Sequence, residues 1–84
     1  MPKKDLSRLI SREVTRLLRD ERIRRGFSMY RIAKKSGLSL QMISYVERGM
    51  RNPTLDTLLR IAAALNVDLS RLIKQASTPP PSAK

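Results

Sequence analysis

The sequence of 84 residues contains no cysteine, no histidine and no tryptophan. Without cysteine, the chain can form neither a disulfide framework nor a thiolate metal site. Without histidine, it lacks the commonest general base, the commonest metal ligand and the side chain that changes charge near neutral pH. We therefore expect no enzymatic activity, no bound metal and no cofactor.

The sequence also lacks a long apolar run. No stretch approaches the roughly 18 apolar residues that indicate a membrane-spanning helix. The start, Met1 to Asp5, is basic but has no apolar segment of the kind found in signal peptides. We expect no membrane partner and a cytoplasmic, nucleoid-associated location. A chain of this length has room for one domain.

Acidic residues are scarce. Seven Asp and Glu stand against 18 Lys and Arg, which gives a formal charge of +11 at pH 7. Such an excess favours a polyanionic partner, either a nucleic acid or an anionic membrane surface. Nothing in the sequence indicates a small-molecule ligand.

A long first helix is predicted from about Asp5 to Arg25, after a flexible basic N-terminus of residues 1–4. Its apolar residues recur at the spacings of three and four that place them on one helix face. They are Leu6, Leu9, Ile10, Val14, Leu17 and Leu18. This stripe either packs on the domain's own last helix or pairs with a second copy of the chain.

Four further helices are predicted, each after a residue that can cap its first turn. The capping residues are Ser28 for a helix over 29–36, Ser39 for one over about 40–48, Thr54 for one that Asn66 closes, and Asp68 for a short last helix. The helical domain then covers residues 5–75. Residues 76–84 include three successive prolines and are expected to form a disordered tail.

The predicted fold class is therefore all-α, and the apolar positions of the helices predict its core. The expected core residues are Leu18, Ile32, Leu38, Ile43, Val46, Leu55, Leu58, Ala62, Leu65, Val67, Leu69 and Leu72. Phe27 is expected to pack at the entry to the second helix.

Residues 28–48 form two short helices joined by a tight turn that contains a glycine, which is the pattern of a helix-turn-helix. Ala33 is small enough to let the two helices approach closely, and Gly37 can take the positive φ that the turn needs. With Leu38, Ile43 and Val46 directed inward, the residues between them must face outward.

The run "RIAKKSGLSLQMISYVERGMRNPTLDTLLRIAAALNVDLSRLI" carries a family resemblance. From about Leu17 to Lys74 the sequence resembles the lambda-repressor-like helix-turn-helix family, also called the Cro-repressor or xenobiotic-response-element type. The resemblance implies a compact five-helix domain that binds double-stranded DNA as a transcriptional regulator, here a repressor. Members of this family often act as homodimers on two-fold sites.

The resemblance also implies roles for residues of the third helix. The positions that would contact bases in the major groove are Ser39, Leu40, Gln41, Ser44 and Tyr45. Gln41 is suited to adenine, because an amide can bond N6 and N7 together, and Leu40 to a thymine methyl group. Tyr45 can reach either a base or a phosphate.

Phosphate contacts are expected near the start of the second helix and in the loop after the third. The candidates are Ser28, Arg31, Lys34, Lys35, Arg48, Arg51, Asn52 and Thr54. The chain departs from the family at Met29, where members commonly carry a glutamine that holds a phosphate. Tyr30 or Arg31 can substitute for it.

Glu47 lies in the last turn of the predicted third helix, where the helix dipole disfavours an anion. The resemblance implies an ion pair with Arg22 that fixes the first helix against the third.

Two other functions stay open from the sequence. One is a protein-interaction module with this fold, such as an antitoxin or adaptor. The other is a membrane-surface peptide built on the first helix.

Overall fold

The computed structural model describes residues 3–78, with side chains from Leu6 onward. This part of the chain forms five helices and no strand. The helices are α1 (Lys3–Arg24), α2 (Met29–Ser36), α3 (Leu40–Glu47), α4 (Leu55–Leu65) and α5 (Leu69–Ser77). The prediction of an all-α, five-helix domain is confirmed.

Local capping explains where the helices begin. The side chains of Ser28, Ser39 and Thr54 each accept a hydrogen bond from the backbone N–H three residues further on, at 3.0–3.1 Å. Asp68 caps α5 by accepting from Ser70 N. These bonds satisfy backbone donors that the first helical turn leaves unpaired.

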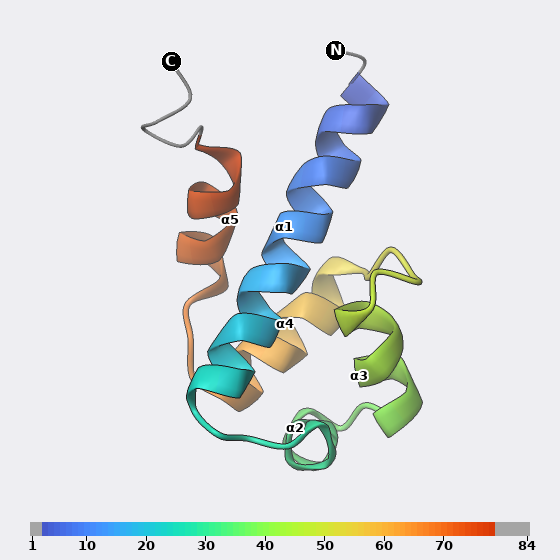
Figure 1. The fold of residues 1–84 in the computed structure, drawn as a ribbon, viewed down its shortest axis with the longest axis vertical. Helices are drawn as coiled ribbons and strands as arrows, with labels where there is room; N and C mark the ends of the chain where they lie inside the picture. The colour runs from blue at the N-terminus through green and yellow to red at the C-terminus, as the bar shows by residue number, and fades with distance from the viewer. Residues whose placement is uncertain (1–2, 79–84) are drawn as a thin grey trace.

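The core lies between the five helices, and each of them contributes at least one buried side chain to it. Its most completely buried large side chains are Ile32, Ile43, Val46 and Leu65. α5 packs along α1, and α3 lies on the opposite side of α1 from α5 (Figure 1). Val14 and Leu18 of α1 are buried in this core, whereas Leu6 and Leu9 are each 51% exposed. The apolar stripe of α1 is therefore divided between core and surface.

Several sequence-based boundaries need correction. α1 begins at Lys3, so residues 3 and 4 are helical and do not belong to a flexible terminus. α5 continues to Ser77 with Ala76 half-buried against the core, so the helical part extends past residue 75. Of the tail expected over residues 76–84, residues 79–84 lie outside the described residues. α3 ends at Glu47, and Arg48 is its C-cap.

One predicted core residue is wrong. Leu55 is 61% exposed: it is the first residue of α4, and although it shares a stripe of the helix with Ala62 two turns later, it lies at the end of that stripe. The packed part of α4 is formed by Leu58, Ile61, Ala62 and Leu65. Phe27 packs against the core as predicted.

Over the described residues, no helix has both the length and the apolar character needed to cross a membrane.

Candidate nucleic-acid interface

The turn between α2 and α3 is tightly built. Gly37 adopts φ +76°, and its N–H donates to Ala33 O at 3.0 Å to close α2. The buried Ser36 hydroxyl donates to the same carbonyl at 3.3 Å and accepts from Leu38 N at 3.2 Å. This network fixes the direction in which α3 leaves α2.

A second contact to this turn comes from α4. Arg60 donates from one guanidinium nitrogen to Ser36 O at 3.4 Å and from Nε to Asp56 at 2.9 Å. Neither Ser36 nor Arg60 was expected from the sequence to support the turn. The Ser36-Gly37 pair is a local turn signal, but the contact with Arg60 joins residues 24 apart in the sequence and has no local signal.

The exposed face of α3 brings together two candidate base-contacting residues. Gln41 Nε2 donates to the Tyr45 hydroxyl at 2.7 Å, across one helical turn. The Arg51 guanidinium lies over the Tyr45 ring at 5.3 Å from its centre, within cation–π range. Tyr45 is half-buried and Gln41 is exposed, so the amide keeps one N–H and its oxygen available on the surface.

The remaining α3 candidates differ in what their side chains already do. Leu40 is exposed at the start of the helix, and Ser44 is half-buried one turn later. The Ser39 hydroxyl accepts the capping bond from Met42 N, which leaves its own proton to donate. Arg48 is exposed just beyond the end of the helix.

The start of α2 presents cations beside α3. Met29, at the position where the family carries glutamine, packs against the core, while Tyr30 and Arg31 are exposed. The Arg31 guanidinium lies 4.0 Å from the centre of the Phe27 ring, and Lys34 Nζ lies 5.6 Å from that of Tyr30. The aromatic rings therefore hold two cations on the surface of α2.

The other α2 candidates are also on the surface. Lys35 is exposed. The Ser28 hydroxyl accepts from Arg31 N at 3.0 Å and keeps its proton to donate.

The loop from Arg48 to Thr54 is attached to α1. Ser11 Oγ donates to Asn52 Oδ1 at 3.1 Å, so the Asn52 side-chain N–H groups remain available as donors. Thr54 accepts from Thr57 N and donates to the Thr57 hydroxyl at 3.1 Å. Of the predicted phosphate contacts, Thr54 is thus the one whose hydroxyl proton is already used within the protein.

Arg22 and Glu47 form a two-point ion pair between α1 and α3. Arg22 Nε and a terminal nitrogen donate to the two Glu47 oxygens at 2.6 and 2.9 Å. The other terminal nitrogen donates to Phe27 O at 2.7 Å. The side chains are only 14% and 11% exposed. The pair therefore ties α1, the entry to α2 and the end of α3 together.

Charge over this surface is of one sign. Between Glu21 and Asp56 the sequence contains a single carboxylate, Glu47, and Arg22 neutralises it. The same interval carries the candidate cations Arg31, Lys34, Lys35, Arg48 and Arg51. No cluster of three or more potential metal-binding side chains occurs among the described residues. The surface is thus suited to a polyanion.

Two capped helices joined at a left-handed glycine, with the second helix exposing polar side chains, define a helix-turn-helix protein. The helix-turn-helix family matches residues 18–72, and the chain belongs to that family.

Individual relatives agree with this assignment. The chain is 38% identical over 72 residues to the HTH-type transcriptional regulator SutR of Escherichia coli, covering 83% of the chain and 40% of that protein. It therefore spans about two fifths of SutR. It is 34% identical over 76 residues to the uncharacterized HTH-type transcriptional regulator y4dJ of Sinorhizobium fredii, covering 90% of the chain and 94% of that protein.

Among solved structures, the restriction-modification controller protein C.AhdI from Aeromonas hydrophila is similar, with a TM-score of 0.67 and 33% identity. The match covers 75% of this chain and 94% of that one. The lambda-repressor-like fold expected from the sequence is confirmed by this likeness and by the family match.

Proposed function

We propose that this chain binds a specific site on double-stranded DNA and regulates transcription from it, with α3 in the major groove. The observation that carries the proposal is the exposed Gln41–Tyr45 pair on α3, flanked by cations with no uncompensated carboxylate. An α-helix fits the major groove, and cations at its edges meet the phosphates on either side. The names of the relatives, transcriptional regulators, support the same function.

Gln41 is proposed to read an adenine. Adenine offers an acceptor at N7 and a donor at N6, so a bidentate contact needs one N–H and one oxygen from the amide. The bond to Tyr45 uses the other N–H and holds the amide in place. Tyr45 thus acts as a positioning residue for Gln41, and its ring is supported by Arg51.

Phosphates are proposed to be held on both sides of α3, the helix that is proposed to read the bases. Ser28, Arg31, Lys34 and Lys35 supply donors and charge from α2, and Arg48, Arg51 and Asn52 supply them after α3. Such contacts position the protein on the duplex without carrying sequence information themselves.

We further propose that two copies bind a two-fold DNA site and act as a repressor. A dimer places its two reading helices about 34 Å apart, one turn of DNA. The exposed Leu6 and Leu9 of α1 provide apolar surface that a second copy can cover. Sedimentation at micromolar concentration, free and on DNA, tests this; a monomer in both conditions contradicts it.

Selection of bound duplexes from a random pool tests the central proposal. The expected result is one enriched sequence, with two-fold symmetry if a dimer binds. A pool that remains random after repeated rounds contradicts sequence-specific binding. If the chain instead co-purifies with one protein in defined ratio and binds no duplex, the protein-interaction alternative replaces the proposal.

A further inference from the structure

Helix α1 carries a row of arginines on the side that faces the loop after α3. At 3.6 residues per turn, positions 8, 12 and 19 lie within about 40° of one another around the helix axis. Arg8, Arg12 and Arg19 therefore share one face of α1. The same face carries Ser11, which bonds to Asn52, and Arg22, which pairs with Glu47.

Arg8 and Arg12 lie next to the proposed phosphate-binding loop. Together with Arg51 and Asn52 they line a shallow hollow between α1 and residues 49–53. Arg12 Nε comes within 3.9 Å of the point where a Cβ at Gly49 would stand. The hollow is lined by no carboxylate side chain among the described residues. Its polar surface therefore consists of guanidinium groups, an amide and hydroxyl groups.

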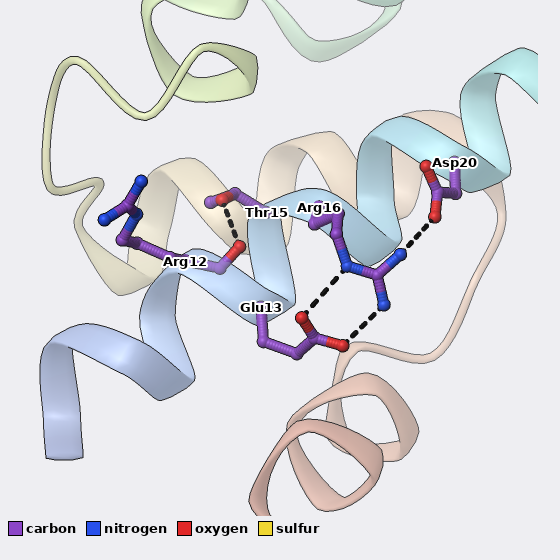
Figure 2. A network of polar contacts seen from close by, with 5 residues as sticks. All are labelled: Arg12, Glu13, Thr15, Arg16 and Asp20. Carbon is purple, nitrogen blue, oxygen red and sulfur yellow. Dashed lines mark hydrogen bonds and ion pairs between the residues drawn. The ribbon is translucent and has the colours of Figure 1, made fainter.

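Arg12 and Arg16 differ although they are one turn apart. Arg16 bonds to Glu13 at 2.5–3.0 Å and to Asp20 at 2.7 Å, so its guanidinium is occupied within α1 (Figure 2). Arg12 has no carboxylate within ion-pair distance among the described side chains, and Figure 2 shows its guanidinium with no such bond. Arg12 is thus available to an external anion, while Arg16 is not.

We propose that Arg8 and Arg12 bind the sugar-phosphate backbone of the same DNA duplex, beyond the phosphates held by Arg51 and Asn52. This inference rests on the proposed function and extends its interface along α1. Guanidinium groups bind phosphate oxygens through paired hydrogen bonds. Four residues of helix separate Arg8 from Arg12 by about 6 Å along the axis, close to two base-pair steps of one strand. Continuity of the hollow with the Arg51–Asn52 loop favours DNA as its occupant.

The test measures DNA affinity against salt concentration, using the duplex selected by the wild-type chain with long flanks. Arg8→Gln, Arg12→Gln and the double variant are compared with Arg16→Gln, which removes the same charge from the same helix. Arg71→Gln on α5 is a second control. Removing one arginine–phosphate interaction should reduce the slope of log K against log salt by about 0.9 and weaken binding roughly five- to tenfold at 0.1 M salt.

The expected result is a slope reduced by about 0.9 in each single variant and about 1.8 in the double variant, with little change in Arg16→Gln and Arg71→Gln. Ethylation interference should identify flanking phosphates that matter for the wild type and not for the double variant. If both single variants keep the slope of the two controls while the wild type binds its site specifically, the inference is wrong and the proposed function stands. If the wild type selects no duplex, both are wrong. Thermal melts show whether each variant is folded. If one single variant is misfolded, the salt slope of the other single variant decides whether the inference holds.

Discussion

Arg22 is the residue at which three segments of the chain are held together. Its guanidinium bonds to Glu47 at the end of α3 and to Phe27 O before α2. Because the pair is largely shielded from water, removing one partner leaves a charge without compensation, at a cost of about 3–5 kcal/mol. The pair thus fixes the angle between α1 and the reading helix.

We predict that Glu47→Ala lowers the free energy of unfolding by about 3 kcal/mol. The double change Arg22→Met with Glu47→Leu should cost less than the sum of its two single changes, because no charge remains unpaired. Urea unfolding of the wild type, the two single variants Arg22→Met and Glu47→Leu and the double variant measures the coupling free energy between the two side chains. Asp56→Asn, which breaks an exposed pair with Arg60, serves as a control and should cost less than about 1 kcal/mol. Additive costs at positions 22 and 47 would contradict the coupling.

A second residue-scale prediction concerns Gln41. Gln41→Ala should weaken binding by about 1–3 kcal/mol on the selected DNA site and relax the preference at one base pair. Tyr45→Phe removes the hydroxyl that holds the amide and should produce a smaller loss at the same base pair. Competition binding with substituted duplexes measures both. Equal losses on selected and random DNA would assign Gln41 to phosphate contact instead.

The α2–α3 turn is an element whose shape depends on backbone conformation. Gly37 and Gly26 both have φ above +70°, where a residue with a Cβ is strained. A Cβ at Gly37 would meet only the end of the Arg60 side chain at 3.5 Å, and one at Gly26 would meet nothing within 4 Å. At both positions, the cost of a substitution should therefore come mainly from backbone strain at positive φ and not from steric contact of the added Cβ.

We predict that Gly37→Ala and Gly26→Ala each destabilise the fold by about 1–2 kcal/mol. Gly37→Asn should cost less, because asparagine tolerates the left-handed region, as Asn66 already does at the end of α4. Thermal or urea unfolding compares the three. A much larger cost at Gly37 than at Gly26 would show that the contact with Arg60 matters more than backbone strain.

The last turn of α1 should respond to acid. Hydrogen bonds from Arg24 and then Arg25 hold the pKa of Glu21 below its ordinary value of 4.5, against the opposing effect of burial. A carboxylate with a lowered pKa in the folded state stabilises the protein at pH values above its unfolded pKa. That stabilisation is lost as the pH falls below about 4.5 and through the folded pKa.

The midpoint of thermal unfolding should accordingly be level above about pH 5 and fall below about pH 4.5. Glu21→Gln should lower the unfolding midpoint at pH 7. It should also reduce the fall of the midpoint between about pH 5 and about pH 3. Glu13, whose pKa is lowered by its bond to Arg16, should contribute in the same direction. A Glu21→Gln profile parallel to that of the wild type would exclude this role.

The helices could be predicted from the sequence because their limits are set locally. Ser28, Ser39 and Thr54 cap helices through bonds that reach only three residues along the chain. The packed face of α4 was harder to predict, because the leucines at 55, 58 and 59 are compatible with two helical faces. Only contact with other helices decides that Ile61 is buried and Leu55 exposed.

The candidate site shows the same division. An outward α3 face follows from the periodicity of Leu38, Ile43 and Val46. The bond between Gln41 and Tyr45 depends on side-chain rotamers, and the contacts of Ser36 with Arg60 and of Ser11 with Asn52 join distant positions. Such contacts follow from tertiary packing, which no local pattern encodes.

For the whole molecule, the distribution of charge matters more than its sum of +11. Each carboxylate whose side chain is described has a partner within the protein: Glu13, Asp20, Glu21, Glu47 and Asp56 pair with arginines, and Asp68 caps α5. Four of these six lie on α1 or α4 in pairs between neighbours in the sequence. Among the described side chains, the exposed cations without a carboxylate partner therefore include those of α2, Arg48 and Arg51 after α3, and Arg8, Arg12 and Arg19 of α1.

This distribution predicts how binding depends on salt. With six to ten phosphate contacts, affinity for the selected DNA site should fall about 10³–10⁵-fold between 50 and 200 mM salt. Random duplex DNA should lose affinity with a similar slope, because phosphate contacts do not depend on sequence. The ratio of the two affinities should change far less, since base contacts release few counterions. Titrations of both duplexes across this range measure the slopes. A shallow slope on both would mean that the cations around α3 do not face DNA, and a ratio that collapses with salt would mean that Gln41 and its neighbours do not read bases.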